Sequence, residues 1–120
     1  MSKKVFLDAF YNQFSDFLTE LTKVFPDDLD FPAYKTALLL LQKTNPRLVV
    51  DQIRLHVLPF EETIRARNES FFLDHTFSEY ADTLDQVIQK LKGLWTQLTE
   101  ANKKCVWDYI ILLIDLTQRC

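Results

Sequence analysis

The sequence is short of residues that make tight turns, with one glycine and four prolines among 120 residues. An all-β sandwich or barrel needs frequent tight turns, so this composition excludes both. Phosphate-binding loops and nucleophile elbows need several glycines and are excluded for the same reason. Two cysteines and two histidines are too few ligands for the usual zinc sites. We therefore expect no cofactor and no bound metal.

An excess of positive charge is also lacking. Lys and Arg total 14 against 17 Asp and Glu, which gives a net charge of −3, so we expect no binding to nucleic acid or anionic membranes. The apolar run Val106–Ile114 is interrupted by Asp108 and is far shorter than the ~20 residues that span a bilayer. The first residues lack the apolar core of a secretory signal. Cys105 and Cys120 form no disulfide framework, so we expect reduced thiols and an intracellular location.

Apolar residues at three- and four-residue steps run through most of the chain and indicate amphipathic helices. With 48% hydrophobic and 13% aromatic residues, there is enough apolar side chain to fill one core. We predict an all-α, compact single-domain bundle of about five to six helices that covers residues 1–120. The expected helices span Lys3–Val24, Asp30–Thr44, Pro46–Leu58, Phe60–Asn68, a segment from the capping-box pair Thr76 and Glu79 through Leu98, and a last segment from an N-cap at Thr99 to Gln118.

Three local features allow sharper predictions. The four consecutive leucines Leu38–Leu41 cover most of a helix circumference, so we expect that helix to be central. The stretch Glu69–Phe77 has no helical stripe and is expected to be irregular, with its Phe-Phe-Leu triplet as a buried turn. Gly93 lies inside a clean apolar stripe, where it either admits a close neighbouring helix or simply weakens its own helix.

The most apolar segment, Val106–Ile114, has two interpretations. A helix that is apolar around nearly its whole circumference is either the centre of the bundle or has one face covered by a partner. Aromatic side chains dominate protein interfaces, so Trp95, Trp107 and Tyr109 are the candidate partner-binding residues. Each of these three side chains also fits the core.

Signals for catalysis are sparse. His56 lies beside an apolar stripe and is typical of a structural histidine, while His75 follows Asp74, and adjacent helical side chains point apart. A small enzyme that uses either histidine with a carboxylate or with Cys105 is the remaining catalytic hypothesis. Asp27, Asp28 and Asp30 begin like a calcium loop, but Pro32 occupies a ligand position and no glycine follows. We expect no catalytic residue.

The order of several short motifs resembles a group of small helical proteins of large DNA viruses of algae and amoebae. The motifs cover most of the chain and are Phe25-Pro26-Asp27-Asp28 with Phe31 and Tyr34, Thr44-Asn45-Pro46, Pro59-Phe60-Glu61, Phe71-Phe72-Leu73-Asp74, Phe77-Ser78-Glu79-Tyr80, Leu91-Lys92, Trp95, Leu98, and Asn102-Lys103-Lys104 to Trp107 and Tyr109. The resemblance implies a viral protein that is made inside a host cell, either as a virion component or as a factor acting on the host. It implies no catalytic residue and no cofactor.

From the sequence we therefore expect a non-enzymatic, all-helical protein–protein interaction module, a viral accessory protein in the host cytoplasm or nucleus. The partner is expected to be a virion protein or a host regulator, and self-association into a homo-oligomer is a further option. The alternative is a virion structural or assembly component, a minor capsid-associated subunit.

Overall fold

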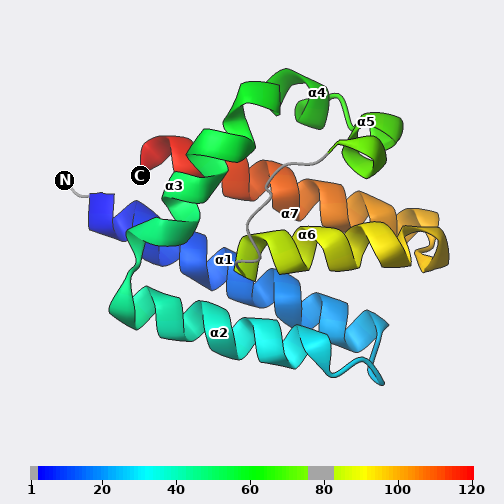
Figure 1. Cartoon of the computed structure of the whole chain (residues 1–120), viewed down its shortest axis with the longest axis horizontal. Coiled ribbons are helices and arrows are strands. Elements are labelled where there is room, and N and C mark those ends of the chain that lie inside the picture. The colour runs from blue at the N-terminus through cyan, green and yellow to red at the C-terminus, as the bar shows by residue number, and fades with distance from the viewer. Residues whose placement is uncertain (1–2, 76–82) are drawn as a thin grey trace.

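A computed structural model describes residues 3–75 and 83–120 of the chain. Seven α-helices and two short 3₁₀ segments make up the described residues, which contain no strand, and together they form one compact globule (Figure 1). The all-α prediction is confirmed. The expected number of five to six helices is too low, because the stretch Glu69–Phe77, which was expected to be irregular, contains a short helix of its own.

The first two helices form an antiparallel hairpin at the edge of the bundle (Figure 1). Helix α1 spans Lys3–Val24 and α2 spans Asp30–Thr44, both as predicted. Proline disfavours α-helical geometry in the residue before it, so α1 ends just ahead of the Phe25-Pro26 pair. At the α2 end of the connection, the carboxylate of Asp28 accepts a hydrogen bond from the backbone N–H of Asp30 at 2.9 Å.

A chain of short helices follows. Helix α3 spans Arg47–His56 and is followed by the 3₁₀ segment η1 at Leu58–Phe60 and then α4 at Glu61–Arg65. The predicted helix to Leu58 is thus slightly too long, because Pro59 cannot continue an α-helix and the chain tightens into a 3₁₀ turn.

Helix α5 spans Glu69–Asp74, where we expected an irregular turn. That prediction is wrong, and the reason is a cap. The side chain of Asn68 accepts a hydrogen bond from the backbone N–H of Phe71 at 3.0 Å, which satisfies one of the free donors of a helix N-terminus. The expectation that the triplet is buried holds for Phe72, whereas its two neighbours are half-buried.

The last helices pack back across the hairpin. Helix α6 spans Thr83–Leu94, the 3₁₀ segment η2 covers Trp95–Gln97, and α7 spans Glu100–Arg119. The predicted cap at Thr99 is confirmed, since its hydroxyl accepts a hydrogen bond from the N–H of Asn102. The predicted start at Thr76 and Glu79 lies outside the described residues. No atom lies within 4 Å of a Cβ built on Gly93, so this glycine admits no close neighbour.

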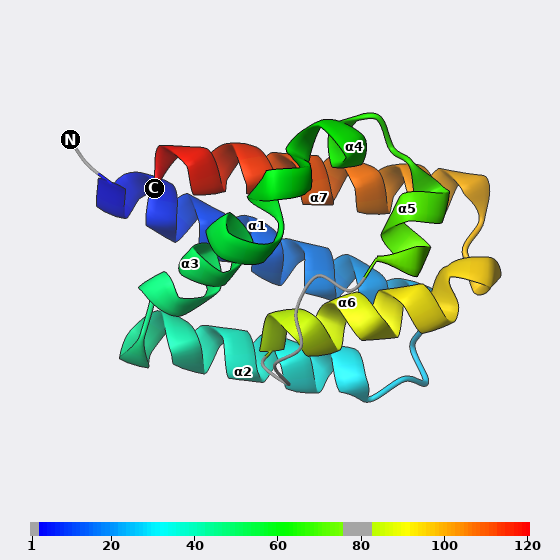
Figure 2. The ribbon, with the colours of Figure 1, turned by 45° about the horizontal axis from the view of Figure 1, so that its top comes forward.

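Helix α2 is not central, because α1 lies between it and α7. Helix α7 packs along α1 on one side and against α3 and α4 on the other (Figure 2). Within Val106–Ile114 four residues are buried, three are half-buried, and Asp108 and Leu112 are exposed, so this helix is buried along one face and not around its whole circumference. The prediction for the leucine block is wrong, because only Leu38 is buried and the next two leucines are exposed on a helix at the edge of the bundle.

Candidate functional site

The structure places the two tryptophans in the core. Trp95 is 1% exposed and Trp107 is 5% exposed. Their ring centroids are 5.6 Å apart, and Phe72 lies within 5.6 Å of both rings. Tyr109 is half-buried and stacks on Phe17, with 5.0 Å between ring centroids. The two indoles are therefore not accessible to a partner in this structure, and only Tyr109 of the three candidates reaches the surface.

The outward face of α2 carries a stripe of uncharged, exposed residues, which we call the α2 stripe. Leu29 is 79% exposed and Leu40 is 60% exposed. Residues three and four positions apart share one face of a helix. The exposed members of this face are Leu29, Pro32, Ala33, Thr36 and Leu40. Helix α2 lies at the edge of the bundle in both views, and in the described structure no other helix covers this face (Figures 1 and 2).

Polar groups near the α2 stripe are directed away from it or satisfied internally. The Thr36 hydroxyl donates to the carbonyl of Pro32 at 3.1 Å, which leaves its methyl group for contact. The Lys35 ammonium donates to the Thr19 hydroxyl on α1 at 2.9 Å. Asp30 pairs with Lys90 on α6 at 2.7 Å. The stripe is thus apolar in character over most of its length, and Lys43 marks its C-terminal end.

Sequence reasoning missed this surface because it treated the leucine block as core. The available signal was the absence of charge at the four positions Leu29, Ala33, Thr36 and Leu40, which share one helix face. Other exposed apolar side chains stand apart from this face. Leu55 on α3, for example, is 66% exposed beside the exposed Arg54, and single exposed hydrophobic residues of this kind are ordinary.

The histidine and cysteine candidates belong to three different elements of the fold. The ring of His75, just after α5, packs against both Phe60 and Phe71, with centroid distances of 4.2 and 4.9 Å. His56 is half-buried at the end of α3. Burial, together with the charges of Glu20 and Asp108, raises the pKa of the Cys105 thiol. A raised pKa is the opposite of what a nucleophilic cysteine needs, because the thiolate is the reactive form.

Residues 3–75 and 83–120 contain neither a metal-binding cluster nor a membrane-spanning helix. In those ranges, no three His, Cys, Asp or Glu side chains gather closely enough to hold a metal ion. Over the same ranges, every helix is too short or too polar to cross a membrane. The acidic group in the α1–α2 connection serves a structural role, since the carboxylates of Asp28 and Asp30 both pair with Lys90. This pairing lowers the pKa of Asp28.

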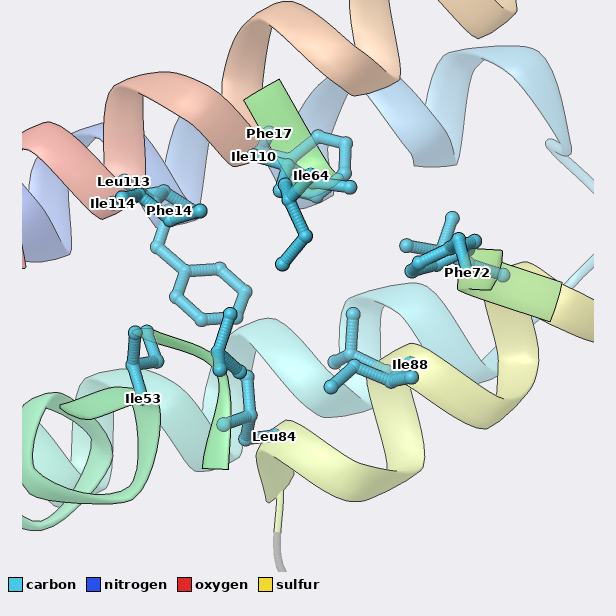
Figure 3. Close-up of a pocket in the computed structure, with 13 residues that line it drawn as sticks. Phe14, Phe17, Ile53, Ile64, Phe72, Leu84, Ile88, Ile110, Leu113 and Ile114 are labelled. Carbon is cyan, nitrogen blue, oxygen red and sulfur yellow. The ribbon is translucent and has the colours of Figure 1, made fainter. Parts of the chain in front are cut away.

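A cavity of about 60 Å³ lies among the helices of the core (Figure 3). Helices α1, α6 and α7 supply most of its walls, and single residues of α3, α4 and α5, together with Val57 just after α3, complete them. Among the described residues, the lining side chains are all hydrocarbon: Phe14, Phe17, Ile53, Val57, Ile64, Phe72, Leu84, Val87, Ile88, Leu91, Ile110, Leu113 and Ile114. Acid–base chemistry needs a titratable group, and none of these described side chains carries one.

Comparison with known proteins adds no further assignment. No protein-family model matches the sequence, and neither a curated protein nor a solved structure was found to match the chain.

Proposed function

We propose that the protein is a non-enzymatic helical module that binds a protein partner through the α2 stripe. The observation that supports this is the run of exposed, uncharged residues from Leu29 to Leu40 on a helix at the edge of the bundle. Contiguous apolar surface on a soluble protein marks interaction sites, because burying it against a partner removes it from water.

The shape of the α2 stripe favours a helix or an apolar groove on the partner. Leu29 and Leu40 project near its two ends, while the small residues Ala33 and Thr36 lie between them. Small side chains let another backbone approach closely, and leucines at both ends fill pockets, which is the pattern of helix-in-groove recognition. Lys43 at the C-terminal end of the stripe favours an acidic residue at the matching place on the partner.

The resemblance to helical proteins of large DNA viruses extends this proposal to the partner. The protein would act inside a host cell as an accessory factor, and the partner would be another virion protein or a host regulator. Fractionation of purified particles separates these options: a constant number of copies per particle supports a virion component, and absence from particles supports a host factor.

The test compares two leucine-to-glutamate variants of similar exposure. Leu40→Glu places a charge inside the proposed contact, near its C-terminal end, and Leu55→Glu places one on α3, outside it. Both leucines are exposed, so each variant should unfold within a few degrees of the unchanged protein. Tagged proteins are purified from their native cellular setting, and the copurifying proteins are quantified by mass spectrometry.

We expect one protein at near one-to-one stoichiometry with the unchanged chain, retained by Leu55→Glu and lost with Leu40→Glu. Cross-linking from Thr36→Cys must then join the partner to α2. The proposal is wrong if the partner remains bound to Leu40→Glu, or if both variants lose it equally. Absence of any stoichiometric partner, together with a monomer by light scattering, also contradicts it.

A further inference from the structure

The apolar cavity among the core helices, which is partly open, is larger than the voids that close packing usually leaves. Protein interiors pack as densely as organic crystals and contain few voids larger than a water molecule. A single water needs roughly 10–15 Å³ measured in this way, whereas this cavity measures about 60 Å³. It therefore has room for several non-hydrogen atoms of a guest.

Water is a poor guest for this cavity. A buried water is held by two to four hydrogen bonds, and the lining side chains that the structure describes offer no donor or acceptor. Figure 3 shows the Phe14 ring, the Ile64 side chain and the Ile88 side chain converging on the same space from α1, α4 and α6. An empty space here forfeits the dispersion contacts that these side chains would make with a guest.

We propose that this cavity binds a small uncharged hydrocarbon group, either a free apolar molecule or the end of an alkyl chain. An apolar guest restores dispersion contacts and loses no hydrogen bonds when it leaves water. A charged or strongly polar guest loses its hydrogen bonds to water and gains none from the hydrocarbon side chains. The site is separate from the α2 stripe, so this inference stands or falls independently of the proposed partner.

The isoleucines provide a direct test with a built-in control. The chain has six isoleucines, and five of them, Ile53, Ile64, Ile88, Ile110 and Ile114, line the cavity. The sixth, Ile111, does not. In a protein labelled at the isoleucine δ1 methyls, dissolved xenon should shift the five cavity signals saturably and leave Ile111 unchanged, relative to argon at the same pressure. Equal shifts at all six, or none, would overturn the proposal.

A matched pair of valine substitutions tests whether the space is free. Val87 lines the cavity, and Val50 is fully buried elsewhere in the core. Val87→Ile adds one methyl group to the void, so it should keep the melting temperature and weaken the xenon shifts. Val50→Ile adds the same group at a fully buried position outside the cavity, so it should lower the melting temperature and keep the xenon shifts. Equal destabilisation by both would show that Val87 faces no free volume.

Competition distinguishes the two sources of the hydrocarbon. Displacement of xenon by n-hexane but not by decanoate assigns the cavity to a free apolar molecule. Displacement by decanoate assigns it to the end of an acyl chain. If neither displaces xenon, the cavity admits only atom-sized guests, and hydrocarbon binding is contradicted.

Discussion

Helix α7 is held by two very different contacts on its two sides. Against α1 the contact is apolar and aromatic: α1 buries six side chains, and the ring of its Phe17 stacks on Tyr109 of α7. Against the segment of α4 and α5, which bury one side chain each, the surface contacts are ionic. Arg65 bridges Glu61 of α4 and Asp115 of α7, and Arg67 pairs with Asp108.

This difference predicts which of the two contacts of α7 is sensitive to pH and salt and which is not. Burial of hydrocarbon depends little on pH or salt, whereas exposed ion pairs are screened by salt and lost when a carboxylate is protonated. Hydrogen bonds from Arg65 and then Gln118 lower the pKa of Glu61. Hydrogen bonds from Lys104 and then Arg67 lower the pKa of Asp108. Stability from these carboxylates is present above their ordinary pKa and lost as the pH falls through the lowered values.

The largest expected effect on the free energy of unfolding comes from a substitution among the buried apolar side chains of α1. Leu18 of α1 is fully buried, so Leu18→Ala removes buried hydrocarbon and leaves a void. We expect the free energy of unfolding to fall by about 2–5 kcal/mol, measured by urea denaturation.

The matched control is Leu55→Ala, which makes the same chemical change at an exposed position. It should alter the free energy of unfolding by less than about 0.5 kcal/mol. If both variants lost stability equally, α1 would not be the centre of the apolar contact.

A second, smaller effect concerns Tyr11, a buried residue of α1 whose hydroxyl group can ionise. Its hydroxyl donates to the carbonyl of Pro46 at 2.6 Å, and burial, with a lesser effect from Cys120, raises the pKa of Tyr11 to about 12. The unfolded chain ionises this group near pH 10. Since the folded chain then holds the proton more tightly, stability is fully present below about pH 10 and declines as the pH rises toward about 12.

Tyr11→Phe isolates this contribution, because it cannot ionise. Relative to the unchanged protein, the variant should lose about 0.5–1.5 kcal/mol at pH 7 through the missing hydrogen bond. The gap between the two should narrow by on the order of 1 kcal/mol between about pH 10 and 11.5, followed by circular dichroism in urea. A constant gap across this range would contradict the raised pKa.

Helix bounds, caps and ion pairs within one helix are far easier to predict from the sequence than contacts between helices. The bounds of α1 and α2 and the cap at Thr99 follow from local rules, since a proline or a hydroxyl beside a helix end acts within one turn. The pair Glu61 and Arg65 was also predictable from its four-residue spacing, and the two side chains meet at 2.7 Å. These features need no knowledge of what lies across the molecule.

Features that depend on distant neighbours were not predictable in the same way. Sequence spacing places Arg54 one turn from Asp51 on its own helix, yet Arg54 donates to the carbonyl of Thr117 in the last turn of α7 at 2.8 Å. Leu40 has the same hydrophobicity as the buried Leu38, but α2 lies at an edge, and hydrophobicity alone does not say where the edge is. The same limit hid the burial of Trp95 and Trp107, and thus moved the candidate interaction surface from aromatic residues to α2.

The smallest expected effect concerns the ion pairs that join α4 to α7. Arg65→Gln removes the cation that joins Glu61 to Asp115, both of which are partly exposed. We expect several-fold faster amide exchange in α4 and α5, measured by hydrogen–deuterium exchange, with no resolved change in α1 or α7. Lowering the pH through the lowered pKa values of Glu61 and Asp108, or raising salt to 1 M, should reproduce the same local change in the unchanged protein after correction for intrinsic exchange rates. Lys23→Gln removes a cation at the far end of α1, where it pairs only with Glu20 among the described residues, so it should leave α4 and α5 as protected as before. Equal protection of α4 and α5 in Arg65→Gln would mean that Ile64 and Phe72 alone hold this segment, and the contrast between the two sides of α7 would then be one of degree.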